Sequence, residues 1–464
     1  MISVADIRER AAEWQLLEET VEKDYVLGWM LWGIAQEPRL ADHWVFKGGT
    51  CLKKCYIETY RFSEDLDFTV LPGGLWQPDD LRAIFGGVLH RIHQECGIDH
   101  QSQPPHFKLR PSGNSVEGRI YYIGPRKTPY AARIKLDITP NERVVLPPVW
   151  REISHSYPDQ LPAPREIPCY AFEEVFAEKL RAMGERCRPR DLFDIVNLYR
   201  RPEIHPAAPL VYDTLKAKCE FKSVAVPTFD MLQASPHRPE LETEWENMLA
   251  HQLPALPPFS SFWEELPELF AWLEGRSLVS APPAIPRARN EVRWEAPATI
   301  SRWGSRIPIE TIRFAGANHL CIQLGYNGTT RIVEPYSLRR TRDGNFVLHA
   351  VRRDTRAHRS YRLDRMEGVK LTTQTFQPVY QVEFSAVGPI VAPPTTRLVA
   401  RARSTKPRKK TRLSGELVYV IQCPVCGKQF ARATMDTNLR KHKMKSWGLD
   451  CPSRTGIFMR TRYR

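Results

Sequence analysis

Two short segments near the start of the chain hold the residue types that nucleotide chemistry requires. Residues 47–53 are Lys-Gly-Gly-Thr-Cys-Leu-Lys, and residues 61–68 are Arg-Phe-Ser-Glu-Asp-Leu-Asp-Phe. Residues two apart in a β-strand point to the same face, so Asp65 and Asp67 can share one divalent cation while Leu66 enters the core. The sequence therefore predicts a site for a nucleoside triphosphate (NTP) and its Mg²⁺ ion.

The glycine turn at residues 47–50 is the predicted phosphate contact. Without Cβ atoms, the backbone can approach a phosphate closely, and a turn that opens a helix offers unpaired N–H groups with positive dipole character. A Gly-Gly pair alone is usually only a turn, and the two aspartates downstream are what favour a nucleotide site. The candidate nucleotide contacts are Lys47, Gly48, Gly49, Thr50 and Ser63.

A third carboxylate stands on a second predicted strand, residues 131–139. Ile134, Leu136 and Ile138 alternate there with charged residues, as in a strand with one buried face. If this strand lies beside residues 65–70, Asp137 completes a three-carboxylate cluster of the kind that two-metal nucleotidyl transfer uses. The alternative is that Asp137 is a solvent-facing residue at the end of a strand.

Two helical segments follow, and each offers a charged candidate. The apolar stripe in residues 170–186 predicts a helix that carries Lys179. Pro189 breaks that helix, and Asp191 falls in the first turn of the next one, where acidic residues also serve as caps. Lys179 can equally be a surface lysine paired with a neighbouring glutamate. An earlier amphipathic helix, predicted at 18–36, leads to the glycine turn.

Together these segments resemble the AbiEii/AbiGii nucleotidyltransferases, the toxins of bacterial type IV toxin–antitoxin and abortive-infection systems. The resemblance rests on four ordered motifs within residues 15–205, namely KGGTCLKK, RFSEDLDF, KLDIT and EEVFAEKLRAMGERCRPRDLFDI. It implies a polymerase-β-like enzyme that depends on Mg²⁺. It further implies that Gly48, Gly49 and Thr50 hold the triphosphate, Asp65 and Asp67 bind Mg²⁺, Lys179 contacts phosphate, and Asp191 and Asp137 are further catalytic carboxylates.

Residues 295–390 have a different composition. Short β-rich runs are separated by Asn-Gly and Asp-Gly turns, which predicts a small β-rich, barrel-like domain with strands at 315–326, 330–333, 345–352 and 379–384. The order of the segments 331–338, 344–345, 350 and 359–366 resembles the WYL domain, a small sensor and regulatory domain of bacterial defence proteins, although the Trp-Tyr-Leu triplet is Phe346-Val347-Leu348 in this chain. This resemblance implies ligand or nucleic-acid sensing, with Tyr336, Arg359 and Arg362 as candidate contacts. The alternative is a basic barrel that serves only for packing.

Near the C-terminus, four residues have the spacing of a structural zinc site: Cys423, Cys426, His442 and Cys451. Four soft or borderline ligands that begin with Cys-x2-Cys suit tetrahedral Zn²⁺, and so short a tail has too small a core to fold without such a link. The pattern resembles two-Cys two-His fingers, with Cys in the last place. A redox Cys-x2-Cys is the rival interpretation, although the βαβ context of such motifs is missing.

Charge and cysteine usage limit the partners and the compartment. Residues 391–464 hold 18 Lys and Arg but three Asp and Glu, so we expect nucleic acid as a partner, the alternative being a solvated basic tail. The seven other cysteines lack the spacing of a disulfide framework, which suits a reducing compartment. No apolar run is long enough to span a bilayer. We therefore expect a soluble, cytoplasmic protein without a membrane partner.

The predicted organisation has three parts joined by two proline-rich or basic segments. An α/β (α+β) polymerase-β-like nucleotidyltransferase domain occupies 1–279, a linker 280–294, the β-rich WYL-like domain 295–390, a basic linker 391–414, and a small zinc-binding module 415–464.

The predicted function is that of a Mg²⁺-dependent nucleotidyltransferase toxin. It would move a nucleoside monophosphate from an NTP to tRNA or protein and be controlled by a cognate antitoxin. The alternative is a nucleic-acid-binding regulator whose nucleotidyltransferase domain has lost its chemistry.

Overall fold

A computed structural model describes most of the chain, in two compact units that comprise residues 1–395 and 396–464. The described residues are 1–57, 61–200, 207–276, 282–285, 291–293, 309–341, 345–384, 417–426, 428–442 and 450–463. The predicted basic linker at 391–414 lies outside them. The predicted boundaries at 279 and 294 also fall on residues that are not described.

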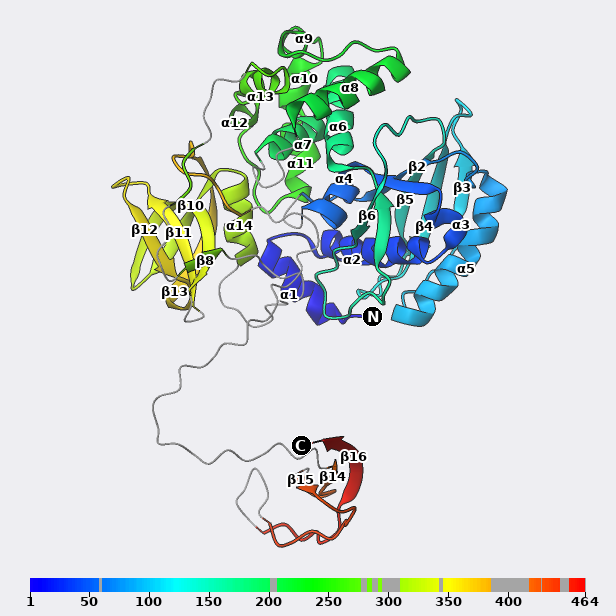
Figure 1. The fold of residues 1–464 in the computed structure, drawn as a ribbon, viewed down its shortest axis with the longest axis vertical. Helices are drawn as coiled ribbons and strands as arrows, with labels where there is room; N and C mark the ends of the chain where they lie inside the picture. Colours follow the sequence, from blue (N-terminus) through cyan, green and yellow to red (C-terminus); the bar gives the residue numbers. More distant parts are fainter. Residues whose placement is uncertain are drawn as a thin grey trace. The chain divides into compact units, whose positions relative to one another are not determined.

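A seven-stranded mixed sheet forms the centre of the N-terminal region (Figure 1). Its strands are β1 (Trp44–Lys47), β2 (Asp65–Val70), β3 (His106–Leu109), β4 (Val116–Tyr122), β5 (Ala132–Thr139), β6 (Val149–Glu152) and β7 (Glu166–Cys169). Their order across the sheet is β3-β4-β5-β2-β1-β7-β6. The prediction that residues 131–139 form a strand beside 65–70 is confirmed, because β5 pairs with β2 in parallel.

The first helices of the chain pack around this sheet. They are α1 (Val4–Trp14), α2 (Glu18–Ala35), α3 (Pro38–Ala41), α4 (Gly48–Cys51) with a π-helical turn at Leu52–Tyr56, and α5 (Pro78–Cys96). Helix α2 is buried on nearly all sides, which fits its largely apolar composition. Its Gly33 allows α5 to approach, since a Cβ there would lie 2.5 Å from Cδ1 of Ile92. The predicted helix at 18–36 is thus confirmed, whereas its predicted amphipathic character is wrong, because polar residues such as Glu22 and Asp24 are buried as well.

A helical region follows the sheet, and Figure 1 shows it in green at the top of the molecule. It consists of α6 (Phe172–Arg186), α7 (Pro189–Tyr199), α8 (Ala208–Lys222), α9 (Phe229–Gln233), α10 (Arg238–Thr243), α11 (Trp245–Leu249), α12 (Ser260–Trp263) and α13 (Leu266–Leu273). Pro189 stands at the start of α7, where its missing N–H costs no hydrogen bond. The predicted break between these two helices is therefore confirmed.

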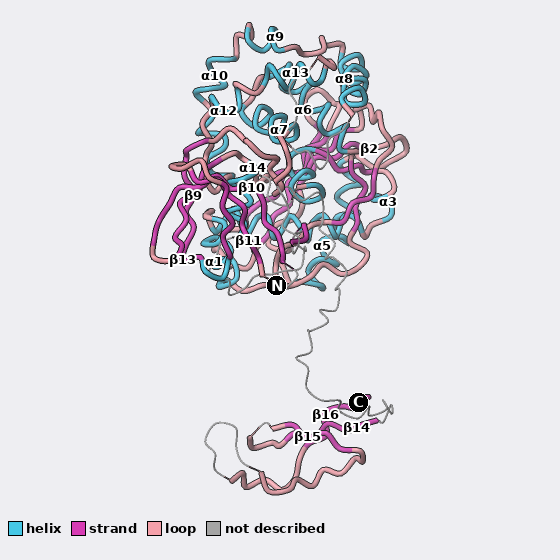
Figure 2. Tube along the Cα trace, turned by 60° about the vertical axis from the view of Figure 1, so that its left-hand side comes forward, coloured by secondary structure: helices cyan, strands magenta, loops and turns pink. Residues whose placement is uncertain are grey.

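The middle region is rich in β-strands, as Figure 2 shows in magenta beside helix α14. It contains β8 (Glu291–Arg293), α14 (Ile309–Ala317), β9 (Leu320–Tyr326), β10 (Thr329–Thr341), β11 (Phe346–Arg352), β12 (His358–Arg362) and β13 (Met366–Thr375). The sheet order is β12-β11-β10-β9-β13, and β8 also pairs with β10. At the predicted Asn-Gly turn, Asn327 and Gly328 both have positive φ, as the tight β9–β10 hairpin requires.

The predicted strand at 379–384 is wrong, and the one predicted at 315–326 begins too early, because β9 covers only Leu320–Tyr326. Residues 315–317 end helix α14 instead of starting a strand. Residues 379–384 form no ladder, because their N–H groups bond elsewhere: that of Val379 donates to the Tyr336 hydroxyl and that of Gln381 to the Pro283 carbonyl. Glu383 makes a single bridge with Ser337.

The middle region shares a hydrophobic core with the N-terminal region. Buried residues of α14 and β9, including Ile312 and Leu324, belong to the same apolar cluster as Leu27 and Leu66. Polar contacts support this packing, because the amide of Asn197 on α7 donates to the side chain of Asn318 at 3.4 Å. The described parts of the N-terminal and middle regions therefore share one core.

The second unit is a small three-stranded sheet, with β14 (Leu417–Gln422) between β15 (Gln429–Arg432) and β16 (Ile457–Tyr463). Among the described residues of this unit, the buried apolar core consists of Ile421 and Leu439 together with two cysteines. None of the helices that the structure describes in either unit is both long and apolar enough to cross a membrane.

We predict that Ile312→Ala lowers the free energy of unfolding of the whole first unit by about 2–5 kcal/mol, because it opens a cavity in the shared core. Urea denaturation followed by fluorescence and by far-ultraviolet circular dichroism should then shift by the same amount. The exposed Ile457→Ala serves as a control and should leave that transition unchanged. Two separate transitions for residues 1–279 and the middle region would contradict the shared core.

Candidate functional site

Strand register brings the predicted carboxylates together. In the antiparallel pair β1–β2, Lys47 lies opposite Asp67, and in the parallel pair β2–β5, Asp67 lies opposite Asp137. Side chains at matched positions of neighbouring strands share one face of the sheet. Asp65 is on the same face, two residues before Asp67. Three carboxylates and one lysine thus lie on one face of the sheet, around β2.

The glycine turn is interlocked with strand β2. Gly48 has a φ of +82°, and a Cβ there would lie well under 3.0 Å from Oδ2 of Asp67. The hydroxyl of Thr50 donates to the Asp65 carbonyl at 2.5 Å, so this buried side chain ties the turn to the strand. A Cβ on Gly49 would meet the guanidinium of Arg61 at 2.8 Å and the hydroxyl of Ser63 at 3.2 Å. Only glycine allows so close an approach at these two positions.

The carboxylates of Asp65 and Asp67 have basic side chains nearby but no direct partner. From the described part of the chain, no hydrogen bond or ion pair reaches their oxygen atoms. Burial raises the pKa of Asp65, and burial together with the charges of Asp137 and Asp65 raises the pKa of Asp67 to about 6, against the opposing charges of Lys47 and Lys179. Two close carboxylates without a direct hydrogen-bond or ion-pair partner are a donor set that suits a divalent cation.

Asp137, in contrast, is already neutralised. Its carboxylate accepts hydrogen bonds from Arg110 and from Lys135, the latter at 2.7 Å. It could join a metal site only by exchanging one of these partners. Lys47 is also engaged, because its amino group lies 3.3 Å from Glu178 and 3.8 Å from Glu142.

Helices α6 and α7 bring a second charged group to the site. The amino group of Lys179 lies 2.7 Å from Asp194 and 3.8 Å from Asp191. Arg186 holds Asp191 through two hydrogen bonds of 2.7 and 2.9 Å. Asp191 is fully buried, so its carboxylate is a fixed partner of Arg186 and is not an open ligand.

Three charged residues that were not predicted belong to this network. Arg61 donates two hydrogen bonds to Asp194, at 2.7 and 2.9 Å, and both side chains are buried. Burial and the charge of Arg61 lower the pKa of Arg190, and its Nε is a buried atom without a hydrogen-bond acceptor among the described residues. Two signals in the sequence could have revealed Arg61 and Asp194. Arg61 is the first residue of the predicted acidic motif, and Asp194 follows Asp191 by three residues, so that both lie on one side of a helix.

The predicted contacts of the WYL-like region do not form one surface. Tyr336 is fully buried, and its hydroxyl accepts a hydrogen bond from the N–H of Val379. Arg362 is paired with Asp364, while Arg359 is exposed. Tyr336 therefore packs inside the domain.

The four predicted zinc ligands form a compact cluster in the second unit. The ligand atoms of Cys423, Cys426, His442 and Cys451 all lie within 4.8 Å of one another. The hydrogen bond of His442 Nδ1 with the Arg440 carbonyl, at 2.9 Å, leaves Nε2 to face Cys426 at 3.3 Å. Burial opposes ionisation, but N–H groups of Cys426 and Val425 lower the pKa of Cys423 to about 6. This donor set fits Zn²⁺.

Comparison with known proteins identifies two parts of the chain. Residues 29–273, more than half of it, match the family described as nucleotidyl transferase AbiEii toxin of type IV toxin–antitoxin systems. Residues 309–371 match the WYL domain. Among the curated proteins, none matches the chain.

One similar solved structure is that of MenT4, a nucleotidyltransferase toxin from Mycobacterium tuberculosis H37Rv. The two chains are 20% identical, and the match covers 59% of this chain and 90% of the other with a TM-score of 0.41.

We predict that Gly48→Ala destabilises the protein by about 2 kcal/mol more than Gly113→Ala. Both glycines have positive φ, so both variants carry backbone strain, but only Gly48 faces another side chain, that of Asp67. Urea denaturation of the two variants measures the difference. Equal losses would show that the turn does not press against Asp67.

We also predict that Asp67→Asn stabilises the metal-free protein at neutral pH. Because the pKa of Asp67 is raised from 3.8 to about 6, ionisation is harder in the folded state, and the resulting penalty is present above pH 6 and lost as the pH falls below about 4. The gain in unfolding free energy at pH 7 should be at most about 3 kcal/mol. Denaturation in a chelator between pH 4 and 8 measures it.

Asp79→Asn is the matched control, because that side chain is 91% exposed. Mg²⁺ should raise the melting temperature of the wild type and of Asp79→Asn but leave Asp67→Asn unchanged. If Asp67→Asn is less stable than the wild type at pH 7, the ionised Asp67 carboxylate does not destabilise the folded protein.

Proposed function

The chain belongs to the AbiEii family of type IV toxin–antitoxin nucleotidyltransferases, and from that premise we propose that Asp65 and Asp67 are the metal-binding centre of a nucleotidyl transfer site. The proposed reaction moves a nucleoside monophosphate from an NTP to an acceptor hydroxyl and releases pyrophosphate. The observation that carries the proposal is that these two carboxylates lie beside the Gly48 turn and that, among the described residues, neither has a hydrogen-bond or ion-pair partner.

Asp65 and Asp67 would hold Mg²⁺, which supplies charge neutralisation for the triphosphate and the departing pyrophosphate when bound. The N–H groups of Gly48, Gly49 and Thr50 would face the phosphates, and Ser63 lies close enough to Gly49 to share that task. Because Gly48 has no Cβ, its backbone lies directly against the Asp67 carboxylate. A phosphate that is bound by this backbone would therefore lie close to the metal-binding carboxylates.

Lys179 would offset negative charge on the phosphates. Its amino group is held by Asp194 and Asp191, which are themselves held by Arg61 and Arg186. Asp191 therefore acts as a positioning residue in this proposal. Lys47 would not bind the nucleotide directly in this proposal, because its ion pairs with Glu178 and Glu142 occupy its amino group. Asp137 would join the metal site only after release from Lys135.

The acceptor in this proposal is tRNA or a protein. An antitoxin is the expected protein partner of a chain from this family, and abortive infection by phage is the proposed setting. The excess of Lys and Arg after residue 391 supports an RNA acceptor, because a basic tail binds phosphate polymers by releasing their counterions.

The test is a transfer assay with α-labelled NTPs, Mg²⁺ and total RNA. The wild type should label RNA, and Asp65→Asn and Asp67→Asn should each lower the rate by at least about a hundredfold, because the charge neutralisation of the transition state is lost. Asp79→Asn should be fully active. Label on polypeptide would identify a protein acceptor.

An absence of transfer with every NTP, together with sequence-selective DNA binding, would overturn the proposal. Such a result would favour the alternative of a nucleic-acid-binding regulator with an inactive nucleotidyltransferase domain.

We further propose that Cys423, Cys426, His442 and Cys451 bind a structural Zn²⁺. The support is the small apolar core of the second unit, in which Cys423 and Cys451 are themselves core residues. Without a metal, so few buried apolar groups cannot offset the entropy of ordering the strands.

We predict that Cys423→Ser lowers the zinc content of the purified protein by one ion per chain. It should also make the second unit sensitive to proteases, because the fold of this unit depends on the metal. Elemental analysis and limited proteolysis measure the two effects. Cys96→Ser is the control, since a hydroxyl can keep the bond that this thiol donates to the Ile92 carbonyl. An unchanged zinc content in Cys423→Ser would exclude the site.

A further inference from the structure

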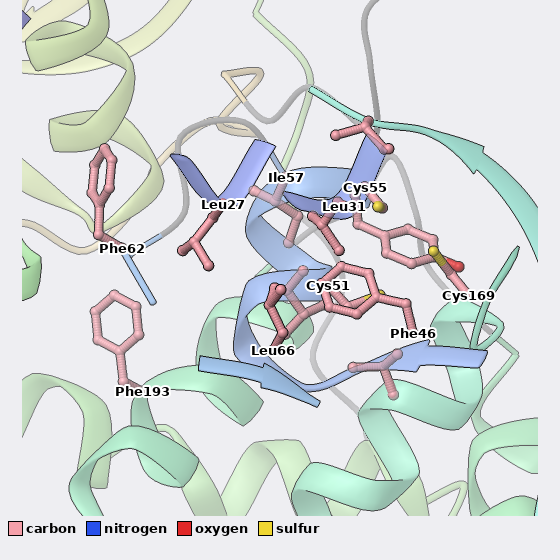
Figure 3. Close-up of a cluster of buried hydrophobic side chains, with 14 of the residues drawn as sticks. Leu27, Leu31, Phe46, Cys51, Cys55, Ile57, Phe62, Leu66, Cys169 and Phe193 are labelled. Atoms are coloured by element: carbon pink, nitrogen blue, oxygen red, sulfur yellow. The ribbon is translucent and has the colours of Figure 1, made fainter. Parts of the chain in front are cut away.

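Three of the cysteines that are scattered along the sequence meet in the interior of the first unit. The Sγ atoms of Cys51, Cys55 and Cys169 all lie within 4.8 Å of one another, and each residue is 0% exposed. Figure 3 shows their yellow sulfur atoms among buried side chains such as Leu31 and Phe46. No disulfide joins them.

The three thiols come from elements that surround strand β1. Cys51 ends helix α4, Cys55 lies one turn later in the π-helical segment, and Cys169 ends β7. Cys169 pairs with Phe46, the residue before Lys47. The convergence therefore depends on the same turn that connects β1 to the acidic strand.

The spacing of the sulfur atoms is close to that of a three-coordinate metal site. Metal–sulfur bonds of about 2.3 Å place three coplanar thiolates about 4.0 Å apart. Sulfur atoms that already lie within 4.8 Å of one another need to move by less than about 1 Å to reach that geometry.

The charges around the cluster select a divalent ion. Arg151 donates to the Cys55 carbonyl at 3.1 Å, and its charge acts on the thiols of Cys51 and Cys55. Lys54 is close but is neutralised by Asp24 at 2.7 Å. Three thiolates, one arginine and an ion of charge +2 sum to zero, whereas a monovalent ion would leave one buried negative charge in excess.

We propose that Cys51, Cys55 and Cys169 form a second metal site, which takes a soft divalent cation of the Zn²⁺ and Cd²⁺ class through three thiolates. As three metal–sulfur bonds form, each thiol that is still protonated releases its proton to solvent, without a change of oxidation state. Soft thiolate ligands favour such ions over Mg²⁺. Because Cys51 follows Thr50, the bound ion fixes the end of the glycine turn.

The test is a titration of the full-length, metal-stripped protein with Cd²⁺ alone under reducing conditions. Bound ions are counted by elemental analysis, and the thiolate-to-metal absorption in the ultraviolet is followed. Cys55→Ser and Cys169→Ser should each bind one ion fewer per chain than the wild type, and Cys96→Ser should bind the same number. Unchanged counts in Cys55→Ser and Cys169→Ser would overturn the proposal.

A measurement on the wild type guards against variants that do not fold. Nuclear magnetic resonance of bound ¹¹³Cd should give two signals, one for the site with three sulfur ligands alone and one for the tail site, in which the nitrogen of His442 joins three sulfur ligands. A single signal that disappears in Cys423→Ser would mean that the three cysteines are only core residues. Neither measurement uses a nucleotide, so the outcome is independent of the proposed transferase activity.

Discussion

The site depends on the register of three neighbouring strands, because that register forces like charges together. Pairing of β2 with β1 and β5 sets Asp67 beside Lys47 and Asp137, and Asp65 follows on the same face. Carboxylates that share a partly buried face repel one another unless cations compensate them. Arg110 and Lys135 bond directly to the carboxylate of Asp137, whereas among the described residues no hydrogen bond or ion pair reaches the carboxylates of Asp65 and Asp67 beside the glycine turn.

The remaining charges of the site form pairs in which each acid has a basic partner. Arg61 and Lys179 hold Asp194, and Arg186 holds Asp191. The ion pair of Arg61 with Asp194 is buried, and breaking it would leave an uncompensated buried charge, which typically costs about 3–5 kcal/mol. The loop that carries the acidic motif is thereby fixed to helix α7.

The sequence predicted those parts of the site that depend on local periodicity. Alternation in 131–139 predicted strand β5, and the short spacing of Asp65 and Asp67 predicted their shared face. The roles of these residues stay predictions. The pairing of Arg61 with Asp194, the pairing of Lys47 with Glu178 and the meeting of Cys169 with Cys51 could not be predicted, because each joins segments more than a hundred residues apart whose register appears only in the fold. The same limit explains the wrong prediction for residues 379–384. Their alternation is typical of a strand, but Glu383 makes an isolated bridge with Ser337 of β10 instead of a ladder.

Helix α7 links the charged site to the middle region. Asp191 and Asp194 occupy its first half, and Asn197 in its last turn contacts Asn318, which follows α14. Just beyond the helix, Arg200 bonds to Glu265, whose carboxylate also lies 3.7 Å from His319. A short helix is stiff over this length, and its interior packs too densely to absorb a shift. The α14–β9 corner and the carboxylates that hold Lys179 are therefore attached to opposite ends of one helix.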